Sequence, residues 1–124
     1  MRLTRYTDYA MRTLLYVAAQ PDRLCSIAEI ARAYQISKNH LMKVVNDLVT
    51  VGYLEGVRGR NGGIRLAKPA REINVGEVVR HTEEGFNLVD CGGRAIAPAC
   101  GFTGVLGKAL AAFMAVLDTY SLQD

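Results

Sequence analysis

Two short amphipathic helical patterns follow each other in the first half of the chain, with a break of about three residues between them. A capping box formed by Ser26 and Glu29 predicts one helix over residues 27–34. Ser37 is a second N-cap and predicts another helix over residues 38–51, with a regular apolar stripe. So short a connection is typical of a helix-turn-helix, although an ordinary helical hairpin has the same spacing.

The first turns of the second helix favour the helix-turn-helix interpretation. Their side chains are polar or cationic and have the length to reach phosphates or base edges of DNA. We expect DNA contacts from Ser37, Lys38, Asn39, His40 and Lys43.

Residues 53–66 predict a β-hairpin directly after these helices, because two short strand patterns flank a basic tip rich in glycine. The Asn61-Gly62 step predicts a tight turn with positive φ. A hairpin in this place is the wing of a winged helix. A nucleotide-binding loop is the alternative for so many glycines, but the Lys-Ser/Thr pair of that motif is missing. We expect DNA contacts from Arg58, Arg60, Asn61 and Arg65.

The remaining patterns predict a mainly α protein with one small hairpin. Thr7 is expected to cap a helix over residues 7–19, and Asn74 a short helix over residues 73–80. A cysteine-bearing loop covers residues 82–101. A last helix over residues 105–122 has a broad apolar face, which suits a dimer interface or packing on its own domain. That face holds Leu106, Leu110, Phe113, Met114, Leu117 and Tyr120.

These patterns divide the chain into a DNA-binding domain over residues 1–80, a sensor loop over 81–104 and a dimerisation helix over 105–124. Charge is also distributed unevenly along the chain. Residues 1–71 hold 12 Lys and Arg against 5 Asp and Glu, while the remaining residues hold 3 Lys and Arg against 7 Asp and Glu. A basic first half fits a polyanionic partner or a solvated basic face.

Several classes of protein are excluded. The chain shows no Ser-His-Asp set, no paired acidic pocket and no cofactor fingerprint, so it is not expected to be an enzyme. No apolar run is long enough to span a membrane, and residues 1–8 lack a signal peptide's apolar core. We therefore expect a cytoplasmic protein without a membrane partner.

The chain has three cysteines, which are Cys25, Cys91 and Cys100. This small, odd number does not suit a disulfide framework. Cys91 and Cys100 share a loop that contains glycine and proline. Thiolates are the usual ligands of iron–sulfur clusters, so this pair either binds a metal or stays as two unligated thiols, which can form a redox pair.

The sequence resembles the Rrf2 family of bacterial winged-helix regulators over nearly its whole length. The motifs that carry the resemblance are residues 1–10, the run from Val57 to Leu66, and the Cys91 to Cys100 loop. Within the family, residues 88–91 and 97–100 look most like the branch of nitric-oxide-sensing repressors. The iron-responsive and cluster-assembly regulators are close neighbours. The resemblance implies a homodimer that represses promoters at a palindromic operator on double-stranded DNA. It also implies a [2Fe–2S] or [4Fe–4S] cluster near the dimer interface.

The loop departs from the family pattern, because the sensing members usually carry three cysteines there and this chain has two. The position expected for the third holds Arg94. In this branch an aspartate of the N-terminal Thr-Asp-Tyr segment can bind the cluster from the other subunit, which implies that role for Asp8; His81 is a further candidate. A site with so few thiolates is labile, so purified protein can lack the cluster. Alternatives are a cluster-free regulator that senses through thiols or a small molecule, and a protein–protein adaptor.

Overall fold

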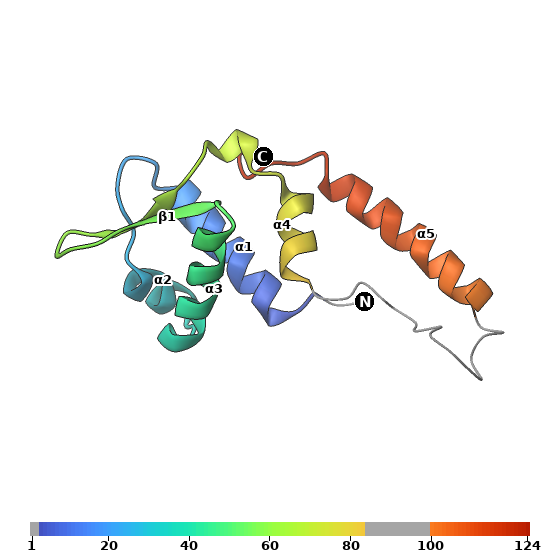
Figure 1. Ribbon diagram of the computed structural model, residues 1–124, viewed down its shortest axis with the longest axis horizontal. Coiled ribbons are helices and arrows are strands. Elements are labelled where there is room, and N and C mark those ends of the chain that lie inside the picture. Colours follow the sequence, from blue (N-terminus) through green and yellow to red (C-terminus); the bar gives the residue numbers. More distant parts are fainter. Residues whose placement is uncertain (1–2, 84–99) are drawn as a thin grey trace.

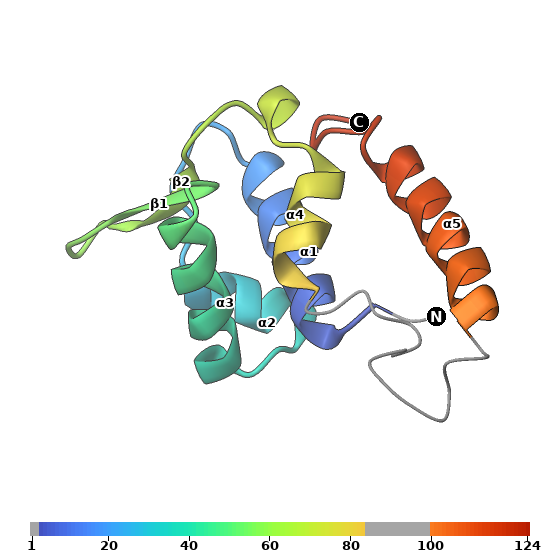
Figure 2. The ribbon, with the colours of Figure 1, turned by 45° about the vertical axis from the view of Figure 1, so that its right-hand side comes forward.

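The computed structural model describes residues 3–83 and 100–124, with the backbone alone for 100–103. Helices α1 to α4 and the two-stranded sheet form one body, and α5 extends to one side of it with its C-terminal end nearest α4 (Figure 1). The turned view in Figure 2 also places α5 beside α4. The elements are α1 (Arg5–Ala18), α2 (Ile27–Tyr34), α3 (Lys38–Thr50), β1 (Leu54–Val57), β2 (Gly63–Leu66), the short 3-10 turn η1 (Ala70–Glu72), α4 (Val75–Thr82) and α5 (Cys100–Leu117). This mainly helical architecture with one small hairpin confirms the predicted fold class.

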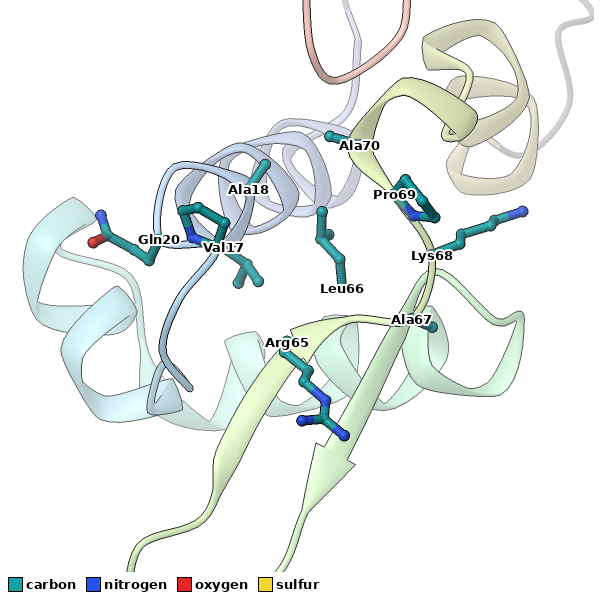
Figure 3. A pocket seen from close by; sticks show the side chains of 10 residues that line it. Val17, Ala18, Gln20, Arg65, Leu66, Ala67, Lys68, Pro69 and Ala70 are labelled. Carbon is teal, nitrogen blue, oxygen red and sulfur yellow. The ribbon is translucent and has the colours of Figure 1, made fainter.

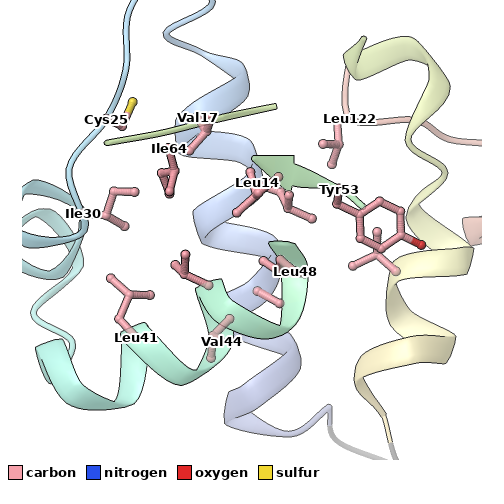
Figure 4. Close-up of a cluster of buried hydrophobic side chains, with 14 of the residues drawn as sticks. Leu14, Val17, Cys25, Ile30, Leu41, Val44, Leu48, Tyr53, Ile64 and Leu122 are labelled. Carbon is pink, nitrogen blue, oxygen red and sulfur yellow. The ribbon is translucent and has the colours of Figure 1, made fainter. Parts of the chain in front are cut away.

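The hydrophobic core lies between α1, α2, α3 and the hairpin, as Figure 4 shows. Helix α3 buries one apolar stripe against the helices that precede it, which follows from the helical period of its sequence. The largest side chains that are fully buried are Leu14, Ile30, Leu41, Leu48, Leu54 and Ile73.

The predicted helix-turn-helix is confirmed almost residue for residue. Ser26 and Glu29 form the reciprocal capping box at the start of α2. Gln35 adopts the left-handed conformation (φ 56°, ψ 47°), which ends α2 and turns the chain within three residues. The Ser37 hydroxyl then accepts a hydrogen bond from the His40 N–H and begins α3. Helix α3 ends at Thr50, one residue earlier than predicted.

The prediction for the start of α1 is wrong. The helix begins at Arg5, and its N-cap is Thr4, whose hydroxyl accepts a hydrogen bond from the Thr7 N–H. Thr7 instead lies inside the first turn with its side chain fully buried, and its hydroxyl is 2.8 Å from the Thr82 hydroxyl. Sequence spacing alone does not separate the two threonines, because the choice depends on contact with the distant helix α4.

The hairpin is present, but its turn differs from the prediction. The two strands pair antiparallel with Leu54 opposite Leu66 and Val57 opposite Gly63. The residue with positive φ in the loop is Gly59 (φ 114°), not the Asn61-Gly62 step. Gly62 is required for a different reason, since a Cβ atom there would lie 2.0 Å from the Val57 carbonyl oxygen.

The boundaries predicted for the last two helices need correction. Helix α4 spans Val75–Thr82 rather than 73–80, with Asn74 as the expected N-cap. Helix α5 starts at residue 100 and ends at Leu117, so residues 118–122 are not helical. There the chain returns to the body, the Leu122 N–H donates to the Ile73 carbonyl (3.1 Å), and the Leu122 side chain is buried in the core.

In the part of the chain that the structure describes, no helix is long and apolar enough to cross a membrane.

The capping box generates a prediction for acid unfolding. Hydrogen bonds from Arg23 and from the Ser26 N–H lower the pKa of Glu29 from 4.5 to about 2. Because the folded-state pKa is depressed, the stabilisation by Glu29 is complete above pH 4.5 and disappears as the pH falls toward 2. Glutamine can still close the capping box, but Glu29→Gln loses the charge that pairs with Arg23. It should therefore lower the free energy of unfolding by up to about 1 kcal/mol at pH 7, with a difference that shrinks below pH 4.5.

Chemical denaturation of both proteins between pH 7 and 2 measures this difference. Glu72→Gln, at an exposed residue of η1, is the control and should change little at any pH. A difference between wild type and Glu29→Gln that stays constant down to pH 2 would contradict the role of the Glu29 charge.

Candidate nucleic-acid interface

The outer face of α3 presents most of the predicted DNA-binding side chains to solvent. Lys38, Asn39 and Lys43 are exposed, since the stripe that packs into the core lies on the other side of the helix. Ser37 is exposed as well, but its hydroxyl is occupied as the N-cap acceptor of α3. Within the described ranges, Lys38 and Lys43 form no ion pair, so both charges are available to an external anion.

His40 lies on the flank of α3 that faces α1. Its ring meets the Tyr9 ring edge to face, with centroids 5.0 Å apart. The residue is still exposed, so the structure places it at the border of the outer face rather than in its centre.

The wing places its cations in two different situations. Arg58, Arg60 and Asn61 are exposed in the loop between β1 and β2, and neither arginine has an ion-pair partner among the described residues. Arg65 lies within β2 and forms an ion pair with Glu55 on the neighbouring strand. The structure therefore brings three of the four predicted wing residues together at the tip and keeps Arg65 apart.

A groove of about 660 Å³ separates α3 from the wing. Its walls come from the start of α2, one edge of α3 and both strands, and include Lys38, Asn46, Val49, Val57 and Arg58. Neither Asn46 nor Met42 was expected from the sequence as a DNA contact. A helical period counted from Lys38 would have found both, because residues four apart share a face.

A chain of polar contacts joins the end of α4 to α3. The Tyr6 hydroxyl donates to Asp47 Oδ2 (2.6 Å), and His81 Nε2 lies 2.8 Å from the same oxygen. Asp47 belongs to α3 and His81 to the last turn of α4. His81, a candidate cluster ligand by sequence, therefore has one ring nitrogen engaged with α3.

Glu83 ties the same end of α4 to the first turn of α1. Its carboxylate accepts hydrogen bonds from the Thr4 N–H (2.9 Å), the Thr4 hydroxyl (2.8 Å) and the Thr7 hydroxyl. Partial burial by itself raises the pKa of the Glu83 carboxyl, but these hydrogen bonds outweigh it and the pKa lies below its usual value. The ionised carboxylate thus replaces solvent at the N-terminus of α1.

One of the three predicted cluster ligands is described by the structure. Asp8 is exposed in the first turn of α1 and forms an ion pair with Arg12 one turn later (2.9 Å). The Arg12 guanidinium also lies over the Tyr34 ring at the end of α2, 5.3 Å from the centroid. The Cys91 residue and the Cys100 side chain lie outside the described residues.

The third cysteine, Cys25, is fully buried, and burial raises the pKa of its thiol.

A second hollow, of about 400 Å³, lies between the end of α1 and the segment that follows β2. Figure 3 shows that Val17 and Leu66 face it, while the charged ends of Arg65 and Lys68 point away. The Lys68 ammonium instead lies 5.3 Å from the centroid of the Tyr53 ring. This lining offers little that could bind a charged ligand.

Comparison with known proteins is consistent with these features. The sequence model of the Rrf2 family, described as an iron-dependent transcriptional regulator, matches residues 3–124. The chain is 53% identical over 130 residues to a Bacillus licheniformis protein named HTH-type transcriptional regulator NsrR, covering 100% of this chain and 91% of that one. A Bacillus subtilis protein of the same name is 52% identical, with 100% and 89% covered.

Solved structures of similar shape include the B. subtilis global cysteine regulator CymR, with a TM-score of 0.79, 21% identity, and coverage of 100% of this chain and 95% of that one. The structure of T. potens IscR has a TM-score of 0.78 and 25% identity, with 100% and 85% covered.

Proposed function

We propose that this chain, which belongs to the Rrf2 family of transcriptional regulators, is a homodimeric repressor that binds a palindromic operator and senses nitric oxide through an iron–sulfur cluster. The family membership confirms the resemblance seen in the sequence. Its named relatives are transcriptional regulators rather than enzymes.

The observation that carries the DNA-binding part is the set of cations without ion-pair partners in the described ranges, Lys38 and Lys43 on α3 and Arg58 and Arg60 on the wing. Cations on two neighbouring elements, α3 and the wing, suit a ligand with regularly spaced phosphates. In the proposed complex α3 enters the major groove, and the wing tip follows the backbone into the adjacent minor groove. Asn39, His40 and Asn61 border these cations and supply neutral contacts.

The homodimer is proposed from α5. Its stripe of Leu106, Leu110, Phe113 and Leu117 is only half-buried by the chain itself. Val105 and Val116, on a neighbouring face, are 61% and 58% exposed. A helix that is apolar on more than one face needs a second surface to cover it. A second copy of the chain supplies that surface, and the resulting dimer has one DNA-binding domain for each half-site of a palindrome.

For the sensor, Cys91 and Cys100 would hold the iron–sulfur cluster, with Asp8 of the other subunit as a further ligand. Thiolate ligands are typical of such clusters, and the bound iron would supply the chemistry that reacts with nitric oxide. The one proposed ligand that the structure describes suits the role, since the Asp8 carboxylate is about half exposed and within the described residues pairs only with Arg12. The family description as iron-dependent supports a metal.

Contacts at the start of α1, near Asp8, and at the end of α4 lead to the proposed DNA-binding face. Asp8 lies in the first turn of α1, which Glu83 holds through Thr4 and Thr7, and His81 contacts Asp47 on α3. A change at the start of α1 or at the end of α4 would therefore move the elements that meet DNA. A cluster-free regulator that senses through its thiols is the second candidate, favoured by the presence of two loop cysteines instead of three.

The wing generates the first test. Arg58→Ala and Arg60→Ala should each weaken binding to an operator duplex. If the lost arginine neutralises a phosphate, the slope of log affinity against log salt should also fall by about one unit. Fluorescence anisotropy at several salt concentrations measures both. Arg71→Ala, which removes an exposed arginine on η1, is the matched control. Unchanged affinity in both wing variants would rule out the wing contact.

The dimer helix generates the second test. Leu110→Asp should give monomer or aggregate in sedimentation, because burial of an unpaired charge costs several kcal/mol. Thr119→Asp adds the same charge at an exposed residue beyond the helix and should leave the dimer intact. A soluble dimer of Leu110→Asp would contradict the assigned face, and loss of the dimer in Val116→Asp alone would move the interface to the neighbouring face.

The sensor generates the third test, which is anaerobic reconstitution with iron and sulfide. Wild type should gain iron and a visible absorption band, Cys91→Ala and Cys100→Ala should not, and Asp8→Ala should bind iron less stably. Cys25→Ala is the control, because this thiol is fully buried in the DNA-binding body. If wild type takes up no iron but still represses and responds to its signal, the thiol-sensing candidate replaces the cluster.

A further inference from the structure

Met42 has an unusual environment on the recognition helix. It lies one turn after Lys38 and one turn before Asn46, so these three side chains form a line along the edge of α3. Met42 is 41% exposed although it is a large apolar residue. Two further apolar side chains, Val49 and Val57, are 37% and 38% exposed and line the groove between α3 and the wing.

A single exposed apolar residue needs no explanation, but Val49 and Val57 line one groove, and Met42 lies on α3 between Lys38 and Asn46, which line it too. Two cations without ion-pair partners among the described residues stand beside it. Lys38 and Arg58 border the groove on its two sides. The ligand that covers it must therefore carry both negative charge and apolar groups. DNA meets this requirement in the major groove, where the C5-methyl group of thymine is the apolar group on the base edges.

Asn46 supplies the complementary polar contact. Within the described part of the chain, its side-chain amide forms no hydrogen bond, so its donor and acceptor are both free. An asparagine amide in the major groove can pair with N6 and N7 of adenine. Four residues of helix advance by about 6 Å, which is close to two base-pair steps of about 3.4 Å each.

We propose that Met42 and Asn46 are specificity-determining residues of α3: Met42 packs on a thymine methyl group, and the Asn46 amide binds an adenine within about two base pairs of it. This assignment rests on the proposed DNA binding and adds which bases the helix selects. Lys38 and Lys43, by contrast, contact phosphates and contribute affinity without regard to sequence.

The experiment begins with selection of duplexes from a random pool by the full-length wild-type chain. Each thymine of the selected half-site is then replaced by deoxyuridine, which removes only the methyl group. When deoxyuridine replaces the thymine that Met42 contacts, wild type should lose about fourfold in affinity, which is the factor expected for one buried methyl-sized group. Met42→Ala should bind the thymine and deoxyuridine duplexes equally, while Met42→Leu should still discriminate between them.

Asn46→Ala should lose about tenfold in affinity for the selected site, and its preference for adenine at one position should disappear. Leu15→Ala, at a residue of α1 that is 44% exposed, is the matched control and should behave as wild type toward every duplex. Circular dichroism of each variant checks that the fold is unchanged.

The outcomes separate this inference from the proposal on which it rests. If wild type enriches no duplex, the DNA-binding proposal fails and this inference fails with it. If wild type binds a selected site but Met42→Ala retains full sensitivity to the thymine methyl groups, or no thymine is sensitive in wild type, only the assignment of Met42 is overturned. An unchanged base preference in Asn46→Ala overturns the role of Asn46.

Discussion

The packing of the buried stripe of α3 against α1 and α2 decides what the rest of the molecule can do. Leu41, Val44 and Leu48 are fully excluded from solvent in this contact. Because helical side chains are spaced at fixed angles, burial of this stripe determines which residues lie outside. Lys38 and Asn46 fall on the edge toward the wing, whereas His40 and Asp47 fall on the edge toward α1.

The edge of α3 that faces α1 links two other helices to the proposed DNA-binding face. Asp47 accepts a hydrogen bond from Tyr6 of α1 and contacts His81 of α4. Glu83 then binds the N-terminal turn of α1 through three donors. Three elements thus meet at the point where the chain leaves α4, so any movement there changes hydrogen bonds on both α1 and the recognition helix.

Helix α5 differs in composition from the helices of the core. Lys108 is its only charged residue between positions 100 and 117. An ion pair between Arg80 and Asp118 (2.6 Å) joins α4 to the end of the helix. After it, the backbone pairing of Leu122 with Ile73 closes the chain onto the core. The C-terminal segment therefore holds α5 to the body while its apolar faces stay only partly covered.

The sequence alone determined the elements whose signals are local. The capping box of α2, the Ser37 cap and the stripe of α3 specify the helix-turn-helix through contacts within a few residues, and these predictions are confirmed. The cations of α3 and the wing tip were also found, because exposed charge follows directly from the pattern. Tertiary structure decided three other features: Thr4 rather than Thr7 is the N-cap of α1, Arg65 pairs with Glu55, and Leu122 returns to the core. Each depends on a contact with a residue that the chain brings close only after folding, and such pairings leave no periodic signal in the sequence.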